Sequence, residues 1–334
     1  MAVHVHAARR FAAQLLGEEK ATSADGVVDR LLAVQAQDPR AFRLAIRART
    51  VDGVPAADVD AALNEGRLVV SWFNRGTLHL VSRDDYWWLH ELTTPQLVTS
   101  INSRLRRLGV DAAAAERGVA AVERALADGP LTRAELREHV AAADVRTEGQ
   151  ALVHVLFLAT LRGLIVRGPM RGREQAVVLV RDWLGAPPKF DRGRAMAELA
   201  RRYVRGHPYG GDRDLARWAR LPLGEVRRGL ADARVEPESA RPAPLPPPML
   251  LGAFEPVLLG WRDRSWILPD AVQAQRLVTD NGIFRPFLLV DGMAAGTWKL
   301  TGGKVTLAPF RDLTDDVMAQ LQADAAAVEA FGLI

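Results

Sequence analysis

The sequence predicts an α+β protein in which helical modules precede a β-rich C-terminal domain. Helix-turn-helix patterns recur three times, hairpin-like strand pairs follow the first two of them, and the segment after residue 248 is mostly strand-like. Because helix, helix, helix and hairpin is the order of a winged-helix module, we predict three tandem winged-helix (helix-turn-helix) modules, of which the third has no clear wing. The predicted boundaries are 1–110, 111–189 and 190–234 for the modules, 235–248 for a proline-rich connector and 249–334 for the β-rich domain.

A polar corner joins two expected helices of the first module. An apolar helical run ends in Gln35 and Gln37, and a new helix can begin directly afterwards. Asp38 can cap that helix, and Pro39 suits its first position, where no N–H is needed. The two amides either satisfy backbone groups at the corner or face a DNA groove, and spacing alone favours the first interpretation. The arginines that follow on the new helix are Arg40, Arg43, Arg47 and Arg49.

The first hairpin is expected from strands at 68–72 and 77–81, joined by a turn with Asn and Gly, which tolerate positive φ angles. Thr77 and His79 share one face of the second strand, close in sequence to Arg75. This group favours either a phosphate or lesion contact, or a buried histidine bonded to a neighbour.

The second module begins with a capping box, Thr132 to Glu135, which predicts a helix to about residue 140. An apolar helix over 149–162 follows, then strands at 164–167 and 175–180 around a turn at 168–173. A basic turn is usually a solvated turn, but in a winged-helix module it favours a phosphate or minor-groove contact. The basic residues at or near this tip are Arg167, Arg171 and Arg173.

The third module contains a basic helix and a helix-turn-helix but no clear wing. A proline-rich stretch at 236–248 replaces the wing and is expected to be extended. The remaining predicted elements are helices at 191–205, 212–218, 224–230 and 312–331, a strand-like segment at 249–260, a hairpin of 287–290 with 293–300 around Asp291-Gly292, and a further strand pair across 301–304.

Composition limits the classes of protein to consider. Hydrophobic residues make up 49% and charged residues 25% of the 334 residues, which is typical of a soluble globular protein of two or three domains. The net charge is +4 and nearly all cations are arginine, which suits phosphate and guanine contacts. The most apolar stretch, 152–166, is interrupted by Arg162 and is too short to span a bilayer. We therefore expect a soluble cytoplasmic protein with no membrane partner.

Several kinds of chemistry have no sequence support. Cysteine is absent, which excludes disulfides, thiol nucleophiles and cysteine zinc sites. The chain lacks G-x-S-x-G, phosphate-loop and GxGxxG motifs, and its 7 histidines show no zinc-ligand spacing. We predict no metal and no cofactor.

Four stretches carry a resemblance that covers the chain from Leu31 to Phe310. They are VQAQDP at 34–39, NRGTLHLV at 74–81, LLGAFEPVLLGWRDRS at 250–265 and NGIFRPFLLVDGMAAGTWKL at 281–300. The chain resembles the winged-helix DNA glycosylases of the AlkZ/YcaQ-like family, which remove bulky alkylated purines and unhook interstrand cross-links. The resemblance implies three tandem winged helices and a β domain in a C-shaped body around DNA. It also implies a monomer that is nucleoid-associated when bound to alkylation-damaged double-stranded DNA.

The resemblance also implies the site. A Q-x-Q or Q-x-D pair is catalytic in that family, and Gln35-Ala36-Gln37 matches the Q-x-Q form, which implies a monofunctional DNA glycosylase. Alkylation at N7 makes guanine cationic, so the base leaves neutral, and glutamine, which does not titrate, suffices without a conventional base. We hypothesise that Gln37 positions the water and Gln35 holds the water or the sugar. The missing third wing and Asn74, where the family usually has an apolar residue, depart from the pattern.

Two other functions fit the same sequence. One is a non-catalytic winged-helix DNA-binding protein, such as a transcriptional regulator, and the other is a protein–protein scaffold. Salt-dependent DNA affinity separates the scaffold from the others, and release of free base separates the glycosylase from the regulator. The residues predicted to contact DNA are Arg40, Arg43, Arg75, Thr77, His79, Arg167, Arg171, Arg173 and Lys299.

Overall fold

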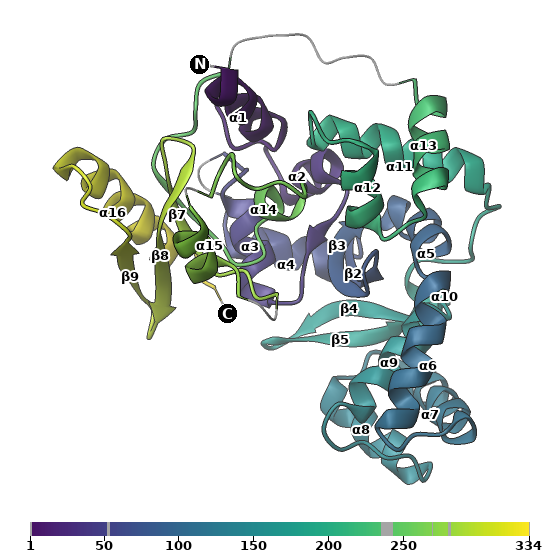
Figure 1. Ribbon diagram of the computed structural model, residues 1–334. Helices are drawn as coiled ribbons and strands as arrows, with labels where there is room; N and C mark the ends of the chain where they lie inside the picture. The colour runs from purple at the N-terminus through teal and green to yellow at the C-terminus, as the bar shows by residue number, and fades with distance from the viewer. Residues whose placement is uncertain (1, 52–53, 235–242, 269, 280–281, 334) are drawn as a thin grey trace. The chain divides into compact units, whose positions relative to one another are not determined.

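The computed structural model describes residues 2–51, 54–234, 243–268, 270–279 and 282–333. The chain separates into two compact units (Figure 1). Unit 1 joins residues 1–59 to residues 196–334, and unit 2 comprises residues 60–195. Helices and antiparallel sheets together confirm the α+β class, whereas the number of winged-helix modules stays a prediction.

The N-terminal part of unit 1 is helical and follows the predicted corner. Ser23 caps α2, because its side chain accepts a hydrogen bond from the Gly26 N–H. Leu32 then adopts a positive φ of 66°, which ends the helix and turns the chain toward the glutamines. The elements of this part are α1 (Ala2–Ala13), α2 (Ala24–Leu31), β1 (Val34–Gln35), α3 (Pro39–Arg47) and the start of α4 (Ala56–Asn64).

The C-terminal part of unit 1 carries the third helix-turn-helix and an antiparallel sheet of order β6-β7-β8-β9. Asp291 and Gly292, with φ of 52° and 73°, form the tight turn predicted between β7 and β8. The helix α16 lies beside β9 (Figure 1). Its Leu321 and Val328 are buried in the same hydrophobic cluster as Trp298 of the sheet. The elements are α11 (Arg192–Gly206), α12 (Asp212–Ala219), α13 (Leu223–Asp232), β6 (Met249–Leu251), α14 (Pro256–Leu259), α15 (Ala271–Leu277), β7 (Phe287–Val290), β8 (Met293–Thr301), β9 (Lys304–Pro309) and α16 (Asp315–Ala330).

One prediction for this part is wrong, and another falls partly outside the described residues. The strand-like segment 249–260 is a strand only over Met249–Leu251, because Gly252 packs against α3 and Pro256 then starts the short α14. The proline-rich connector lies outside the described residues over 235–242, and its remaining residues form neither helix nor strand.

Unit 2 contains helices and an antiparallel sheet of order β3-β2-β4-β5. Both predicted hairpins and the Thr132 capping box are confirmed. The predicted turn at 168–173 is too wide, because β4 continues to Arg171 through an irregularity in register. The elements are β2 (Leu68–Phe73), β3 (Thr77–Ser82), α5 (Tyr86–Thr93), α6 (Val98–Arg107), α7 (Ala112–Ala125), α8 (Arg133–Ala142), α9 (Ala151–Leu161), β4 (Ile165–Arg171), β5 (Glu174–Leu179) and α10 (Val180–Trp183).

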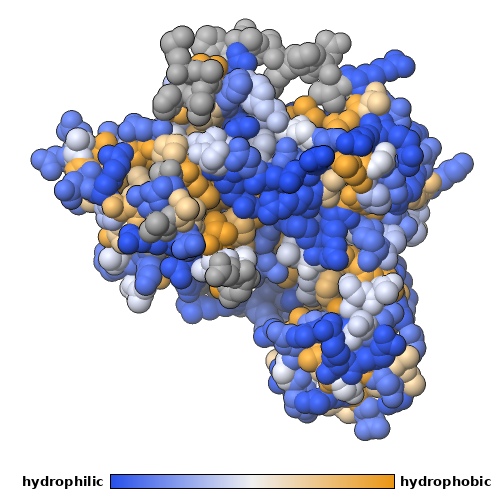
Figure 2. Space-filling model, viewed as in Figure 1, coloured by the Kyte–Doolittle hydropathy of each residue, from blue (hydrophilic) through white to orange (hydrophobic). Residues whose placement is uncertain are grey.

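The core of unit 2 lies between α6, α7, α8, α9 and the hairpin of β4 and β5. Leu152, Val155 and Leu156 of α9 are at most 1% exposed and form its centre. The outer surface is largely hydrophilic on the face seen in Figure 2, with hydrophobic side chains scattered between charged ones. This distribution is that of an ordinary globular protein.

Candidate functional site

The two glutamines form a bonded pair in unit 1. Gln35 ends β1 and is only 6% exposed, whereas Gln37 is exposed. The Gln35 Nε2 amide donates a hydrogen bond to Gln37 Oε1 over 2.8 Å. The buried amide therefore fixes the orientation of the exposed one.

The helix α3 begins directly after this pair, as predicted. The side chain of Asp38 accepts a hydrogen bond from the Arg40 N–H over 2.8 Å, and Pro39 occupies the first turn. This cap sets the direction in which the backbone leaves Gln37. Asp38 therefore has a structural role beside the glutamines.

The two arginines of this corner lie in different environments. Arg40 is exposed on the first turn of α3. Arg43 is 1% exposed, donates from Nη1 to the Pro39 carbonyl over 2.8 Å and stacks its guanidinium over the Phe42 ring. Arg43 thus braces the first turn of α3, and Arg40 presents the cation to solvent.

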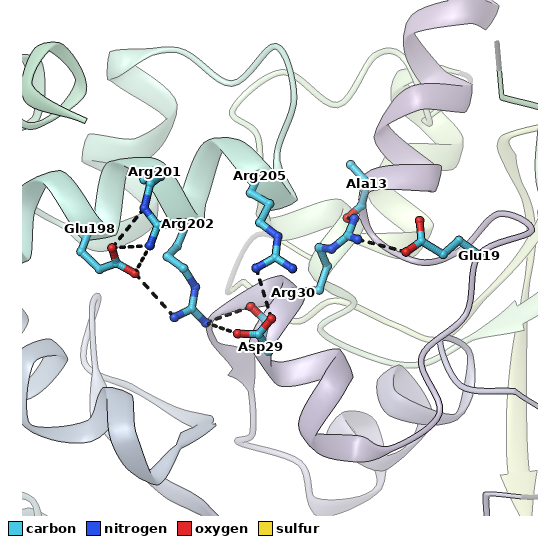
Figure 3. Close-up of polar contacts among 8 residues, drawn as sticks. All are labelled: Ala13, Glu19, Asp29, Arg30, Glu198, Arg201, Arg202 and Arg205. Atoms are coloured by element: carbon cyan, nitrogen blue, oxygen red, sulfur yellow. Dashed lines mark hydrogen bonds and ion pairs between the residues drawn. The ribbon is translucent and has the colours of Figure 1, made fainter. Parts of the chain in front are cut away.

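The helix α2, which leads into the glutamines, is held by α11 through ionic contacts (Figure 3). Arg202 Nη2 donates to the Asp29 carbonyl over 2.8 Å, and Arg205 Nη1 donates to Asp29 Oδ2 over 3.1 Å. On the other side, Arg30 Nη2 bonds Glu19 Oε1 over 3.2 Å. These contacts fix the C-terminal end of α2 and hence the chain that precedes Gln35.

The end of α3 is fixed by a buried ion pair. Arg49 and Glu255 are both fully buried, and Arg49 Nη2 donates to Glu255 Oε1 and to Gln14 Oε1. Gln14 in turn donates to the Gly206 carbonyl over 3.2 Å. The segment that carries the glutamines is therefore anchored at both ends to distant parts of the chain.

The predicted basic residue of the last domain lies elsewhere in unit 1. Lys299 is exposed on β8, opposite Thr306 of β9. Among the described residues, no hydrogen bond or ion pair links it to Gln35 or Gln37.

In unit 2, Thr77 and His79 share a face of β3 and are bonded, because His79 Nδ1 donates to the Thr77 carbonyl over 2.9 Å. His79 is 2% exposed, and burial, with the nearby charge of Arg75 as a smaller cause, lowers its pKa to about 3. The imidazole is neutral at pH 7, so it offers no cation to a phosphate. The alternative of a buried histidine bonded to a neighbour describes this residue.

The three arginines of the second hairpin are not equivalent. Arg167 lies within β4 opposite Val70 of β2, with its guanidinium over the Trp72 ring, and burial lowers its pKa. It is therefore not at the tip, which corrects that prediction. Arg171 pairs with Glu135 over 3.1 Å, and Arg173 is exposed in the turn.

In the described part of the chain, no three or more His, Asp or Glu side chains are grouped so as to hold a metal ion. Within the same residues, every helix falls short of the length or apolar character needed to cross a bilayer.

The glutamine pair can act as a neutral hydrogen-bonding device. One lone pair of Gln37 Oε1 accepts from Gln35, and the second can accept from a water or lie near a positive centre. Sequence reasoning found the pair and its cap and assigned Gln35 to the water or the sugar, whereas in the structure Gln35 donates to Gln37. The buried position of Gln35 within an apolar run was the signal that could have indicated this.

Comparisons with known proteins were made over the whole chain. A family model described as DNA glycosylase AlkZ-like matches residues 28–331. A solved structure, the DNA glycosylase AlkZ of Streptomyces sahachiroi, is similar with a TM-score of 0.79 and 22% sequence identity, over 98% of this chain and 96% of that chain. At this identity, the structural likeness shows the fold. No curated protein matches the chain at a significant level.

Proposed function

Because the chain belongs to the AlkZ-like DNA glycosylase family, we propose that it is a monofunctional DNA glycosylase for N7-alkylated purines, including bulky and cross-linked ones. Its substrate is double-stranded DNA that carries alkylation damage, and water is the nucleophile. The observation that supports this function best is the bonded pair of an exposed Gln37 and a buried Gln35.

The chemistry follows from the charge of the lesion. Alkylation at N7 makes the purine cationic, so the glycosidic bond breaks with departure of a neutral base and positive charge develops on the sugar. Gln37 Oε1 accepts a hydrogen bond from the attacking water and places an amide dipole near the oxocarbenium-like carbon. Gln35 is a positioning residue, because its amide holds Gln37 in the required orientation.

The DNA contacts are assigned to the predicted cations that reach solvent. Arg40 follows Gln37 on the first turn of α3, and Lys299 and Arg173 are exposed on hairpins. Arg75 lies in a hairpin turn and is partly exposed. Each supplies a sequence-independent contact to the phosphate backbone from its own unit.

Release of free base from a duplex with a single N7-methylguanine tests this function. We expect the protein to release the base, and we expect the Gln37→Ala variant to lose about 100-fold in single-turnover rate, as for removal of one positioned transition-state group. Gln35→Ala should lose activity to a similar extent. Gln320→Ala, at an exposed position on α16, serves as the matched control and should leave the rate unchanged.

The outcomes separate the three candidate functions. Retained activity in both glutamine variants would remove the catalytic assignment. Salt-dependent DNA binding without base release by the unaltered protein would favour a non-catalytic regulator, and no salt-dependent DNA affinity would favour a protein scaffold.

A further inference from the structure

A braced arginine in unit 1 has no role in the site described so far. Arg264 follows α14 and donates from Nε to the Leu258 carbonyl over 2.6 Å. Its guanidinium stacks over the Phe284 ring, 5.1 Å from the centroid. These two contacts fix the plane of the guanidinium, and among the described residues its two terminal nitrogens bond to none.

A second arginine, Arg217, lies on α12, the helix to which the loop of Arg264 is bonded. Arg217 is exposed on α12, and the loop that carries Arg264 is joined to α12 by a hydrogen bond from the Arg262 N–H to Asp214 Oδ1, over 2.9 Å. Burial first, and then the positive charge of Arg217, lower the pKa of Arg264 to about 10. Both side chains are therefore cationic at pH 7 and repel each other.

The carboxylates of this region are occupied by other groups. Asp214 accepts from the Gly211 and Arg262 N–H groups, and Asp263 accepts from the Ser265 N–H. The charges of both carboxylates act on Arg10, whose guanidinium stacks over the Trp261 and Trp266 rings. Among the described residues, no carboxylate forms an ion pair with Arg217 or Arg264.

Two like charges on elements that are bonded to each other, without a carboxylate partner among the described residues, are stabilised by an anion. Guanidinium groups present paired N–H donors that match the oxygens of a phosphate. Phosphodiesters are the anions that the substrate of a DNA glycosylase supplies in quantity.

We propose that Arg217 and Arg264 together bind a phosphodiester of duplex DNA. This contact rests on the proposed function and adds a DNA-binding site on α12 and the loop after α14. It uses residues other than the glutamine pair and the hairpin residues, and it serves to position the duplex on unit 1.

Binding of an undamaged fluorescent duplex, measured by anisotropy over a range of NaCl concentrations, tests this site without base release. For Arg217→Ala we expect a several-fold weaker affinity and a salt slope that is shallower by about 0.9, the value for one phosphate contact. Arg201→Ala is the matched control, because Arg201 is already paired with Glu198 in the same unit, and its slope should not change.

A charge reversal distinguishes this site from a structural role. In Arg217→Glu a carboxylate replaces the cation whose charge acts on Arg264, so Tm should stay the same or rise while DNA affinity falls more than in Arg217→Ala. A merely structural arginine predicts lower Tm with unchanged salt slope.

Each remaining outcome decides the proposal. Unchanged slopes in both Arg217 variants would overturn the phosphate site, and base release by the unaltered protein would then leave the glycosylase function standing. Failure of the unaltered protein to bind duplex DNA would overturn both. A rise in Tm with inorganic phosphate at constant ionic strength, without a change in the DNA slope, would assign the arginines to a free anion instead.

Discussion

Gln35 and Gln37 carry the same side chain in different environments. Gln35 is buried away from water, and a buried amide without a partner is costly. Its hydrogen bond to Gln37 therefore holds the Gln35 side chain in one orientation. The exposed Gln37 keeps its second lone pair for the reaction. Neither amide titrates, so the proposed chemistry has no ionisation of its own near neutral pH.

The donor role of Gln35 predicts the effect of Gln35→Glu. At pH 7 the introduced carboxylate cannot donate to Gln37 Oε1, so base release should fall by about 100-fold, and it should recover as pH falls and the carboxyl protonates. The measurement is the single-turnover rate of the variant divided by that of the unaltered protein at each pH. A ratio that does not change with pH would exclude the donor role.

His207 predicts a pH dependence of stability. Burial is the main cause that lowers its pKa from 6.5 to about 4 in the folded protein. Protons therefore favour the unfolded chain between these two values, and the free energy of unfolding should fall as pH drops through this window. Urea unfolding at several pH values measures the slope, to which the buried His79 adds in the same sense.

Substitution identifies the histidine responsible. His207→Gln should make the slope shallower, whereas His139→Gln, at an exposed position on α8, should leave it unchanged. An unaltered slope in the His207 variant would show that other groups control acid stability.

Sequence could predict those residues whose role depends on their neighbours along the chain. The Q-x-Q spacing and the Asp38-Pro39 cap are of this kind. The burial of Arg43 and the neutral state of His79 depend on packing by segments far away in the sequence, so local pattern does not reveal them.

At the scale of elements, the cap of α3 links the fold to the glutamines. Asp38→Ala removes the hydrogen bond to the Arg40 N–H and should lower the free energy of unfolding by about 1 kcal/mol. It should also slow base release, because Gln37 directly precedes the cap. Denaturant unfolding and single-turnover kinetics measure the two effects.

Thr132→Ala provides the control for this variant. Thr132 caps α8 in unit 2, so its removal should cost a similar free energy of unfolding without a slower rate. Equal losses of rate in both variants would show that stability alone explains the effect of Asp38→Ala.

Some predicted turns agreed with the structure, whereas the bounds of the turn at 168–173 and the strand-like segment at 249–260 did not. The turns at Asn74, Asp291 and Gly292 have the positive φ angles that their residue types favour. The segment after Leu251 is apolar like a strand, but Gly252 packs against α3, a tertiary contact that periodicity does not encode.

At the scale of the whole molecule, unit 1 depends on contacts between distant parts of the chain. The Glu255→Ala variant leaves Arg49 buried without a counter-charge, which should lower the free energy of unfolding of unit 1 by about 3–5 kcal/mol. Replacing both residues, as Arg49→Met with Glu255→Leu, should cost much less. A double-mutant cycle by chemical denaturation gives the coupling, and additive losses would contradict it.

The pairing of residues 1–59 with 196–334 is the part of the fold that sequence reasoning reached least. The predicted modules follow one another in linear order, because periodicity and turn chemistry report only neighbours along the chain. Contacts such as those of Arg202 with Asp29 join residues more than 170 positions apart, and no local pattern specifies them.

This discontinuity sets the order in which the protein can mature on the ribosome. The glutamine segment is translated early, yet Glu255, the counter-charge of its anchor, emerges about 200 residues later. Unit 2 is contiguous and can therefore fold first. The N-terminal helices cannot complete their packing at that stage, because the strands that cover Phe11 and Leu16 have not been synthesised. A nascent chain stalled when residue 195 has left the ribosomal tunnel but Glu255 has not should thus hold a folded unit 2 and an N-terminal segment that chaperones can bind.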